Sequence, residues 1–368
     1  MRGSIKKNGI SWYYVLDLGK DEKGSRKQKK KRGFKTKKEA EKALVEAINS
    51  INKGTYIEPT KMTYKDYLEQ WFNTKKNSIG AQSVIVYENC LRKRIKPILG
   101  HITLSKLSSI HIQSFIDNLY DEGLSSCTIK KYFEIIRNSL EYAADFNLIN
   151  NNVAIKVKLP KTNYSEMKVW NNDEANQFLK VAKTDYCYIV FKLALATGLR
   201  QGEILGLRWK DVNLEKGFLY VKQTLSHDGK SFKQGAKTKT SKRTVDLSKS
   251  TIKALKEQRL LIEKDKKTLG PIYKDFDLIA CTHHGSPHNA SNIRRSFNRL
   301  IKLANVPKIR FHDLRHTHAT LLLSKGVNIK VISERLGHSN IKVTLDTYSH
   351  VLPTMQEEAV RKIDEIFE

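Results

Sequence analysis

The chain has 368 residues, which is long for one ordinary domain and predicts two or three. Its 67 Lys and Arg against 38 Asp and Glu give a net charge of +29, so the expected partner is a polyanion, above all nucleic acid. Four scattered cysteines without a C-x-x-C pair argue against a disulfide framework or zinc site and for a reducing compartment. Without a membrane-length apolar run or a signal-peptide segment, we expect a cytoplasmic protein that has no membrane partner.

Residues 1–58 form a small, strongly basic region. The aromatic and β-branched stretch 11–18 predicts a strand, and the basic stretch 26–34 predicts another. Thr36 and Glu39 form a capping box that starts an amphipathic helix. A three-stranded sheet plus one helix is therefore expected, either as a solvated charged appendage or, as we favour, as a reader of a DNA groove. The candidate DNA contacts of this sheet are Lys29, Lys30, Lys31 and Arg32.

A second basic region, residues 61–147, is predicted to be all-helical. Apolar residues at helical spacing begin after Thr63, and further helices are expected over about 81–96, 108–121 and 126–146. The turns between these helices are expected at Pro97, Gly100 and Gly123. The pattern predicts a four-helix domain.

The largest region, residues 168–368, is predicted to be mixed α/β, mainly α with a small sheet. One helix is expected to start at Asn171, and further helices are expected over 186–196, 250–266 and 290–304. Strands are expected over 218–221, 243–247 and 277–281. After residue 304 the chain is expected to be helical with brief turns, ending in an amphipathic helix over 355–367. The predicted fold class is therefore a multidomain, mostly α chain with a small N-terminal sheet-plus-helix domain.

Several side chains of this last region suit phosphoryl transfer. His312 and Arg315 are expected on one face of a helix, where they combine a proton-transfer group with a forked phosphate clamp. Arg200 follows the Gly198 that ends an apolar helix, and His338 lies in a turn. Tyr348, near a helix end, can form a covalent intermediate. Taken singly, each has an ordinary structural explanation; it is their combination that points to chemistry.

Four further positions are candidates beside these. Lys237 and Lys239 lie at a predicted β-hairpin tip, which can lower a lysine into a DNA groove or be a solvated loop. His316 and His318 lie beside an apolar stretch on other faces of the helix that carries Arg315. We expect both to be satisfied core histidines and leave them out of the site.

The whole chain resembles the tyrosine recombinases, the phage-integrase family. The stretch 196–204 (ATGLRQGEI) is similar to the first arginine motif of that family, and 311–317 (FHDLRHT) to the second. Leu336-Gly337-His338-Ser339 and Thr347-Tyr348-Ser349-His350 are similar to the third motif and the nucleophile motif. Lys237 fits the Lys-Thr hairpin pattern best, with Lys239 as the alternative. The resemblance extends to residues 1–58 as an arm-type DNA-binding domain, 61–147 as a core-binding domain and 168–368 as the catalytic domain.

The resemblance implies a mechanism without a metal or cofactor. Tyr348 attacks a DNA phosphodiester and forms a 3′-phosphotyrosyl bond, while Arg200 and Arg315 bind the non-bridging oxygens. Lys237 protonates the leaving 5′ oxygen, His312 is a general base or proton shuttle, and His338 donates a hydrogen bond to the phosphate. Two nearby guanidiniums are expected to favour the tyrosine oxyanion.

The implied partners are double-stranded DNA with core-type and arm-type attachment sites, a homotetramer, an excisionase and a host DNA-bending protein. The final helix is expected to dock either on a neighbouring protomer or on its own domain. Two alternatives to an integrase stay open: a resolvase or invertase of the same chemistry, and a non-catalytic DNA-binding regulator. A type IB topoisomerase is a weaker third.

Overall fold

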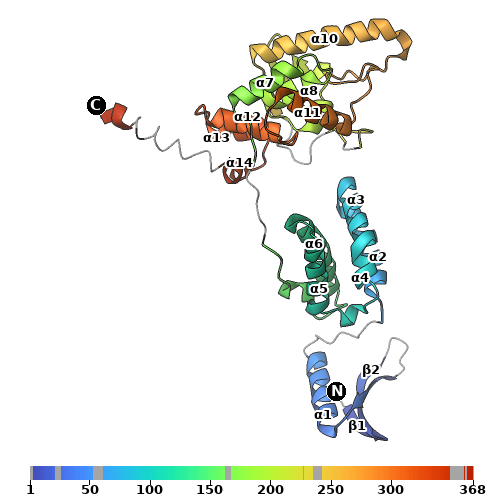
Figure 1. The fold of residues 1–368 in the computed structure, drawn as a ribbon. Coiled ribbons are helices and arrows are strands. Elements are labelled where there is room, and N and C mark those ends of the chain that lie inside the picture. Colours follow the sequence, from blue (N-terminus) through green and yellow to red (C-terminus); the bar gives the residue numbers. More distant parts are fainter. Residues whose placement is uncertain are drawn as a thin grey trace. The chain divides into compact units, whose positions relative to one another are not determined.

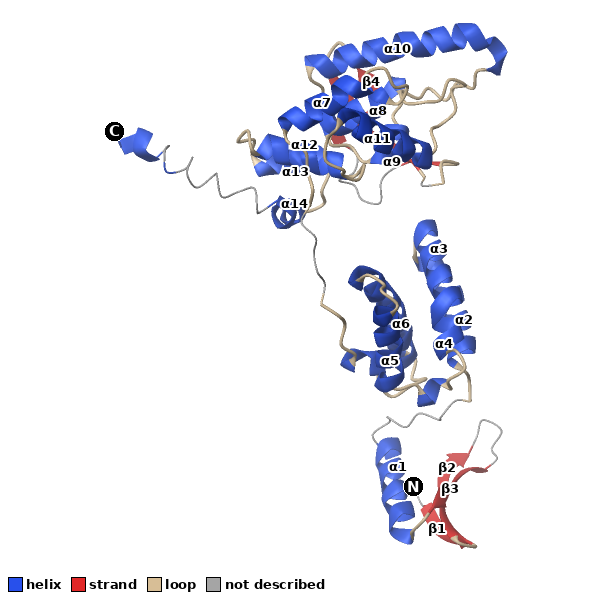
Figure 2. Cartoon of the chain, viewed as in Figure 1, coloured by secondary structure: helices blue, strands red, loops and turns tan. Residues whose placement is uncertain are grey.

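A computed structural model describes residues 3–20, 26–52, 61–161, 167–226, 228–234, 243–348, 360 and 363–367 (Figure 1). The chain divides into two compact units, Met1–Tyr164 and Ser165–Glu368. Helices make up most of the described chain and strands are short and few beyond the N-terminal sheet (Figure 2), so the expected mostly α, multidomain fold class is confirmed.

An antiparallel sheet begins the first unit. Its strands β1 (Gly3–Asn8), β2 (Ser11–Lys20) and β3 (Arg26–Phe34) lie in that order, and α1 (Lys37–Asn52) packs on it through Leu44. The sequence predicted a third strand without locating it, because the polar stretch 3–8 has little apolar content of its own. Pairing with β2 along its whole length makes β1 a strand.

The rest of the first unit is the expected helical region. Its helices are α2 (Tyr64–Lys75), α3 (Ala81–Cys90), α4 (Lys96–Leu99), α5 (Ser109–Asp121) and α6 (Ser126–Asp145), with short turns η1 (Lys76–Ser78), η3 (Leu104–Lys106) and η4 (Val153–Lys156). The turn expected at Pro97 was wrong. A π-helical turn, η2 (Leu91–Ile95), joins α3 to α4, and Pro97 lies at the start of α4. Because the π turn already interrupts the regular i−4 hydrogen bonding, the helix tolerates a residue without an N–H there.

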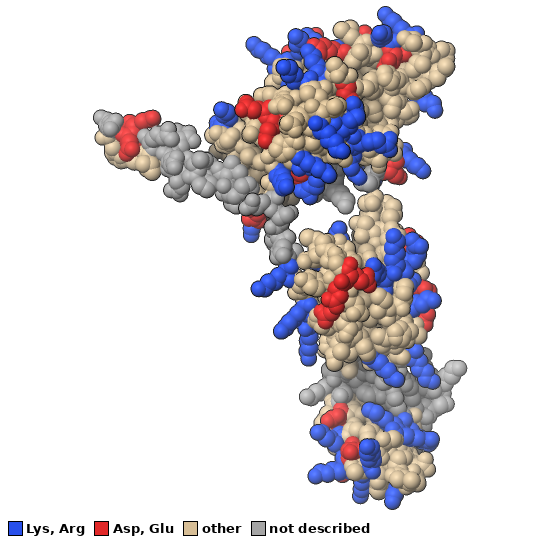
Figure 3. Space-filling model, viewed as in Figure 1, with Lys and Arg blue, Asp and Glu red and all other residues tan. Residues whose placement is uncertain are grey.

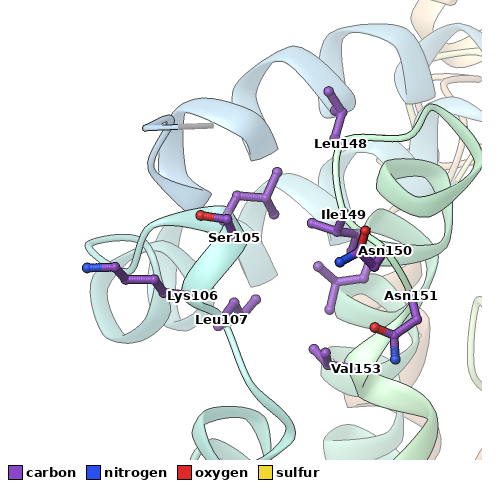
Figure 4. A pocket seen from close by; sticks show the side chains of 10 residues that line it. Ser105, Lys106, Leu107, Leu148, Ile149, Asn150, Asn151 and Val153 are labelled. Atoms are coloured by element: carbon purple, nitrogen blue, oxygen red, sulfur yellow. The ribbon is translucent and has the colours of Figure 1, made fainter. Parts of the chain in front are cut away.

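A pocket of ≈ 340 Å³ opens in this helical region (Figure 4). The residues that line it are mostly apolar, joined by two asparagines, one serine and one lysine: Leu104, Ser105, Lys106, Leu107, Leu140, Leu148, Ile149, Asn150, Asn151 and Val153. None of the candidate catalytic residues lines it.

The second unit contains the candidate site. Its helices are α7 (Asn172–Ala182), α8 (Tyr188–Thr197), α9 (Gln201–Leu205), α10 (Lys249–Leu269), α11 (Ala290–Ala304), α12 (Asp313–Leu323), α13 (Ile329–Leu336) and α14 (Ile341–Tyr348), with short turns η5 (Trp209–Asp211) and η7 (Gly270–Ile272). The strands β4 (Val212–Asn213), β5 (Phe218–Val221) and β8 (Arg243–Asp246) form one sheet, and β6 (Gln223–Leu225) pairs with β7 (Phe232–Gln234).

The apolar helix α8 lies at the centre of this unit, in contact with α7, α9, α10 and α12. A cluster of aromatic rings fills the core beside it: Trp170, Phe178, Phe191, Phe297 and Phe311. The predicted strand over 277–281 was wrong, since that stretch makes only the isolated bridges Arg208–Leu278 and Cys281–Pro287. Strands β6 and β7 were not predicted. Of the expected C-terminal helix, the structure describes residues 360 and 363–367, which are helical.

Candidate active site

Three arginines from distant parts of the chain meet at the C-terminal end of α13. Their guanidiniums donate to three successive carbonyls: Arg243 Nε to Arg335 (2.8 Å), Arg315 Nη2 to Leu336 (2.7 Å) and Arg200 Nη2 to Gly337 (3.5 Å). The last carbonyls of a helix lack partners within the helix and form the negative end of its dipole. They therefore stabilise positive charges that would otherwise repel one another.

Gly337 is needed for this arrangement. It ends α13 in the left-handed conformation, with a φ of 70°, and its N–H donates to the carbonyls of Ser333 and Glu334. A Cβ at this position would lie 2.8 Å from Nη1 of Arg243. Both the backbone conformation and the close approach of the guanidinium favour glycine.

A buried carboxylate balances part of this positive charge. Glu203, which is 2% exposed, accepts hydrogen bonds from Arg243 (Nη1–Oε1 3.2 Å, Nη2–Oε2 2.9 Å) and from Arg200 (Nη1–Oε1 3.0 Å). Burial alone would raise the pKa of this carboxyl, but the hydrogen bonds from Arg243 and the charges of both arginines outweigh burial and lower it. No role was predicted for Glu203 or Arg243. The sequence feature that could have indicated their contact is the i, i+3 spacing of Arg200 and Glu203, which is typical of an ion pair.

Arg315 is the deeply buried member of the cluster, at 3% exposed. Its Nη1 donates to the carbonyl of Gly198 (2.7 Å), so its two Nη atoms join the end of α8 to the end of α13. Burial, followed by the charge of Arg200, lowers the pKa of Arg315 to about 9. In contrast, the side chain of Arg200 is 40% exposed and can offer donors to a ligand.

The end of α8 sets the position of Arg200. Gly198 caps the helix with a φ of 66°, and a Cβ there would lie 2.6 Å from Cδ2 of Leu336 and 2.7 Å from Cδ2 of His318. The close packing of α8 against α12 and α13 therefore requires glycine. Arg200, two residues later, is the N-cap of α9.

His338 directly follows Gly337 and is half-buried. Its Nδ1 lies 2.7 Å from Oγ1 of the buried Thr344, in α14. Burial and the charges of Arg315 and Arg200 lower the pKa of His338 to about 4, so the ring is neutral near pH 7. It lies beside the arginine cluster with one ring nitrogen fixed by Thr344.

Tyr348 is fully buried at the end of α14, where its ring packs with Ala319, Leu323 and Leu336. Its hydroxyl lies 2.8 Å from Nδ1 of His316. Burial raises the pKa of Tyr348 to about 12, although the charge of Arg315 acts in the other direction. The charge of Arg315 therefore acts in the expected direction, in favour of the oxyanion, but desolvation of the buried hydroxyl outweighs it.

His316 was left out of the predicted site, and the structure brings its ring into contact with Tyr348. Its half-buried ring contacts both Tyr348, through the hydrogen bond, and His312, with 5.2 Å between ring centroids. The position directly after Arg315 gave no local signal for this contact, which depends on α14 packing against α12.

His312 is the N-cap of α12, with helical backbone angles (φ −65°, ψ −25°), and is exposed. The backbone N–H of Arg315 donates to its carbonyl (3.1 Å), so the two residues lie in the same helical turn. Burial of its ring and the charge of Arg315 lower its pKa. No hydrogen bond is recorded between His312 and Tyr348 among the described residues, and His316 is the histidine in contact with the hydroxyl.

His318 is a core histidine, as expected. Its Nδ1 lies 2.7 Å from the carbonyl of Leu195, and its Nε2 accepts a hydrogen bond from Arg335 Nε (3.2 Å). Burial and the charge of Arg335 lower its pKa to about 4. Arg335 also donates to the carbonyls of Ala196 and Asp246, so this pair joins α8, α12, α13 and the end of β8.

The candidate lysines Lys237 and Lys239 lie outside the described residues, as does the side chain of Lys29. Lys30, Lys31 and Arg32 are exposed on β3. The cationic groups of the last two lie over aromatic rings of the sheet, Lys31 over Phe34 (5.9 Å) and Arg32 over Tyr13 (5.8 Å). Basic side chains are also distributed over the visible face of both units (Figure 3). 

Among the residues that the structure describes, no three His, Cys, Asp or Glu side chains are grouped so that they could hold a metal ion. In the described part of the chain, no helix combines the length and apolar content needed to cross a membrane.

Comparisons with known proteins cover all three regions. A domain described as "Phage integrase family" matches residues 168–355, an "Arm DNA-binding domain" matches 4–51, and a "Phage integrase, N-terminal SAM-like domain" matches 63–120. The chain is 34% identical to a "Tyrosine recombinase XerC-like" protein of Caldanaerobacter subterraneus, over 98% of both chains. It is 29% identical to the "ICEBs1 integrase" of Bacillus subtilis, over 75% of this chain and 76% of that protein.

Two solved structures have a similar fold. The Tn1549 transposon integrase in complex with a circular intermediate DNA gives a TM-score of 0.70 at 20% identity, over 82% of this chain and 99% of that one. A lambda integrase dimer bound to a COC′ core site gives 0.60 at 19% identity, over 93% of both chains.

Proposed function

The chain belongs to the phage integrase family, and from that premise we propose that it is a site-specific tyrosine recombinase that cuts and rejoins DNA to integrate a mobile element. The observation that carries the proposal is the meeting of Arg200, Arg315 and His338 at the end of α13, with Tyr348 at the end of the next helix. A cluster of cationic and neutral donors beside a tyrosine suits an anionic phosphodiester and a phosphotyrosyl intermediate.

In this proposal, Tyr348 Oη attacks the phosphorus, and the bond from phosphorus to the 5′ oxygen breaks. Arg200 and Arg315 stabilise the charge of the pentacoordinate state, and His338 donates a hydrogen bond to a non-bridging oxygen. Lys237, or Lys239 in its place, protonates the leaving 5′ oxygen. His312 assists proton transfer from the tyrosine. The 5′ hydroxyl of a partner strand then attacks the phosphotyrosyl bond and releases Tyr348, so the proposed exchange uses neither a metal nor ATP.

The proposed domains are an arm-type DNA-binding domain over 1–58, a core-binding domain over 61–147 and a catalytic domain over 168–368. The names of the matched domains and the basic, aromatic face of β3 support this division. Two DNA-binding regions upstream of the catalytic domain would hold arm-type and core-type attachment sites. Exchange between two duplexes calls for a homotetramer in the cytoplasm, assisted by an excisionase and a host DNA-bending protein.

A nicked suicide substrate tests the chemistry. The DNA carries a core-type site with a nick next to the scissile phosphate, so that the cleaved fragment diffuses away and the covalent complex accumulates. The wild type should form a denaturant-resistant protein–DNA adduct, whereas Tyr348→Phe should bind the DNA equally well and form none. An adduct that persists in Tyr348→Phe would exclude Tyr348 as the nucleophile. Absence of an adduct from the wild type would favour a non-catalytic regulator.

Deletion of residues 1–58 tests the domain assignment and separates an integrase from a resolvase or invertase. The shortened protein should still form the adduct on a core-type site but should no longer integrate a plasmid that carries the full attachment site. Normal integration by the shortened protein would contradict the assignment of an arm-type domain.

A further inference from the structure

The hydroxyl of Tyr348 has a hydrogen-bond partner that the proposed mechanism does not use. Nδ1 of His316 lies 2.8 Å from Tyr348 Oη, and the two ring centroids are 5.8 Å apart. The two residues come from different helices, α12 and α14, and are 32 positions apart. This contact therefore fixes the end of α14 relative to the helix that carries Arg315.

We propose that His316 is the positioning residue for the nucleophile, and that its Nδ1 accepts the hydrogen bond that orients the Tyr348 hydroxyl for attack. This inference rests on the proposed function. His316 acts through Tyr348, and the proposal assigns it the orientation of the hydroxyl and leaves proton transfer to His312.

The chemistry of the pair determines the direction of the hydrogen bond. Burial, with the charges of His312 and Arg315, lowers the pKa of His316 to about 4, and burial raises that of Tyr348 to about 12. Near pH 7 the imidazole is neutral and the phenol keeps its proton. The phenol is thus the donor and Nδ1 the acceptor, with the ring hydrogen on Nε2.

The surroundings of the ring fix this geometry. The backbone of His316 lies within α12, whose neighbours Arg315 and Thr317 are fully buried. The ring of His312 stands edge-on to that of His316, with an interplanar angle of 86°. Around the phenol, Ala319, Leu323 and Leu336 form an apolar wall. In such surroundings the tyrosine hydroxyl needs a partner, and His316 supplies it.

Two substitutions separate positioning from the other roles that His316 could have. His316→Leu removes the acceptor. His316→Asn places an amide oxygen close to the position of Nδ1, so it can accept the hydrogen bond but cannot take up a proton. Misplacement of a reacting group by about 1 Å typically costs ~10²-fold in rate. We therefore expect His316→Leu to slow single-turnover cleavage of the nicked suicide substrate by ~10²-fold, and His316→Asn to recover at least a tenth of the wild-type rate.

The controls make the outcomes unambiguous. DNA binding and the thermal midpoint are measured for each variant, and His284→Leu, an exposed histidine in the same unit, should cleave at the wild-type rate. Wild-type cleavage by His316→Leu, or faster cleavage, would overturn the proposal. Equal loss in His316→Leu and His316→Asn, with both folded and bound to DNA, would also overturn it, since proton transfer would then be the role of this residue. Failure of the proposed function is distinct, because the wild type itself would then form no adduct.

Discussion

Both carboxylate oxygens of Glu203 accept hydrogen bonds from Arg243, at 3.2 Å to Oε1 and 2.9 Å to Oε2. The same Oε1 accepts from Arg200, and Nε of Arg243 donates to the carbonyl of Arg335. One buried anion thus joins the start of α9, strand β8 and the end of α13. Arg200, a candidate phosphate-binding residue, is therefore oriented by this network and not by its own helix alone.

Substitution of Glu203 by glutamine should destabilise the catalytic unit. The change removes the anion while Arg243, with 7% of its side chain exposed, stays buried and charged. Breaking a buried ion pair from one side typically costs roughly 3–5 kcal/mol. We expect a loss of this order in the free energy of unfolding, measured by urea denaturation followed by tryptophan fluorescence. Glu215→Gln, at an exposed position, is the control, and equal stability of the two variants would contradict the prediction.

Arg315→Lys should impair cleavage although it keeps the charge. The guanidinium donates from Nη1 to Gly198 and from Nη2 to Leu336, both at 2.7 Å, and a single ammonium cannot span the two carbonyls. Loss of one transition-state donor typically costs ~10²–10³ in rate, so adduct formation should slow by that factor with little change in DNA affinity. Arg294→Lys, an exposed arginine on α11, should retain cleavage within a few-fold. Cleavage by Arg315→Lys at the wild-type rate would show that the two-pronged guanidinium is not required.

Gly337→Ala has a matched control in Gly229→Ala. The two glycines have nearly the same positive φ, 70° and 71°, but an added Cβ meets no atom within 4 Å at Gly229 and lies 2.8 Å from Arg243 at Gly337. The left-handed conformation costs both alanines about 1–2 kcal/mol. Only Gly337→Ala should lose more stability than this and also lose cleavage activity, because Arg243 and His338 must move. Indistinguishable thermal midpoints and cleavage rates for the two variants would contradict the steric argument.

The stability of the chain should fall in mildly acidic solution. The pKa of His318 is lowered by burial to about 4 in the folded chain, from an ordinary value of 6.5. The unfolded chain therefore binds a proton more readily, so the stability that is present above pH 6.5 is lost as the pH falls toward 4. By linkage, this one residue should contribute a loss on the order of 1–2 kcal/mol at pH 5.

The measurement compares urea unfolding at pH 7.5 and pH 5. His318→Gln, which keeps an acceptor for Arg335 but cannot be protonated, should lose less stability over this interval than the wild type. His284→Gln should behave as the wild type does. If His318→Gln and the wild type lose equal stability, His318 is not responsible for the acid sensitivity.

The difference between His312 and His316 shows where local patterns stop being informative. Helical spacing predicted that His312 and Arg315 share a face, and His312 continues the first turn of α12 from the N-cap, with helical backbone angles. His316 seemed a core residue because it borders an apolar stretch, yet it holds the hydroxyl of Tyr348. Both outcomes depend on where α12 starts and on which helix packs against it.

By itself, the sequence determined the order of the motifs, most helices and the family, because capping, periodicity and motif spacing act over a few residues. The capping box of Thr36 with Glu39 and the glycine that ends α8 at Gly198 are such local signals, and both are present in the structure. Only the tertiary structure decided that Glu203 and Arg243 pair across 40 positions and that Arg315 joins two helix ends 138 positions apart in the chain. The physical reason is that buried charges take their partners from whatever the packed core brings within hydrogen-bonding distance, which no local pattern encodes.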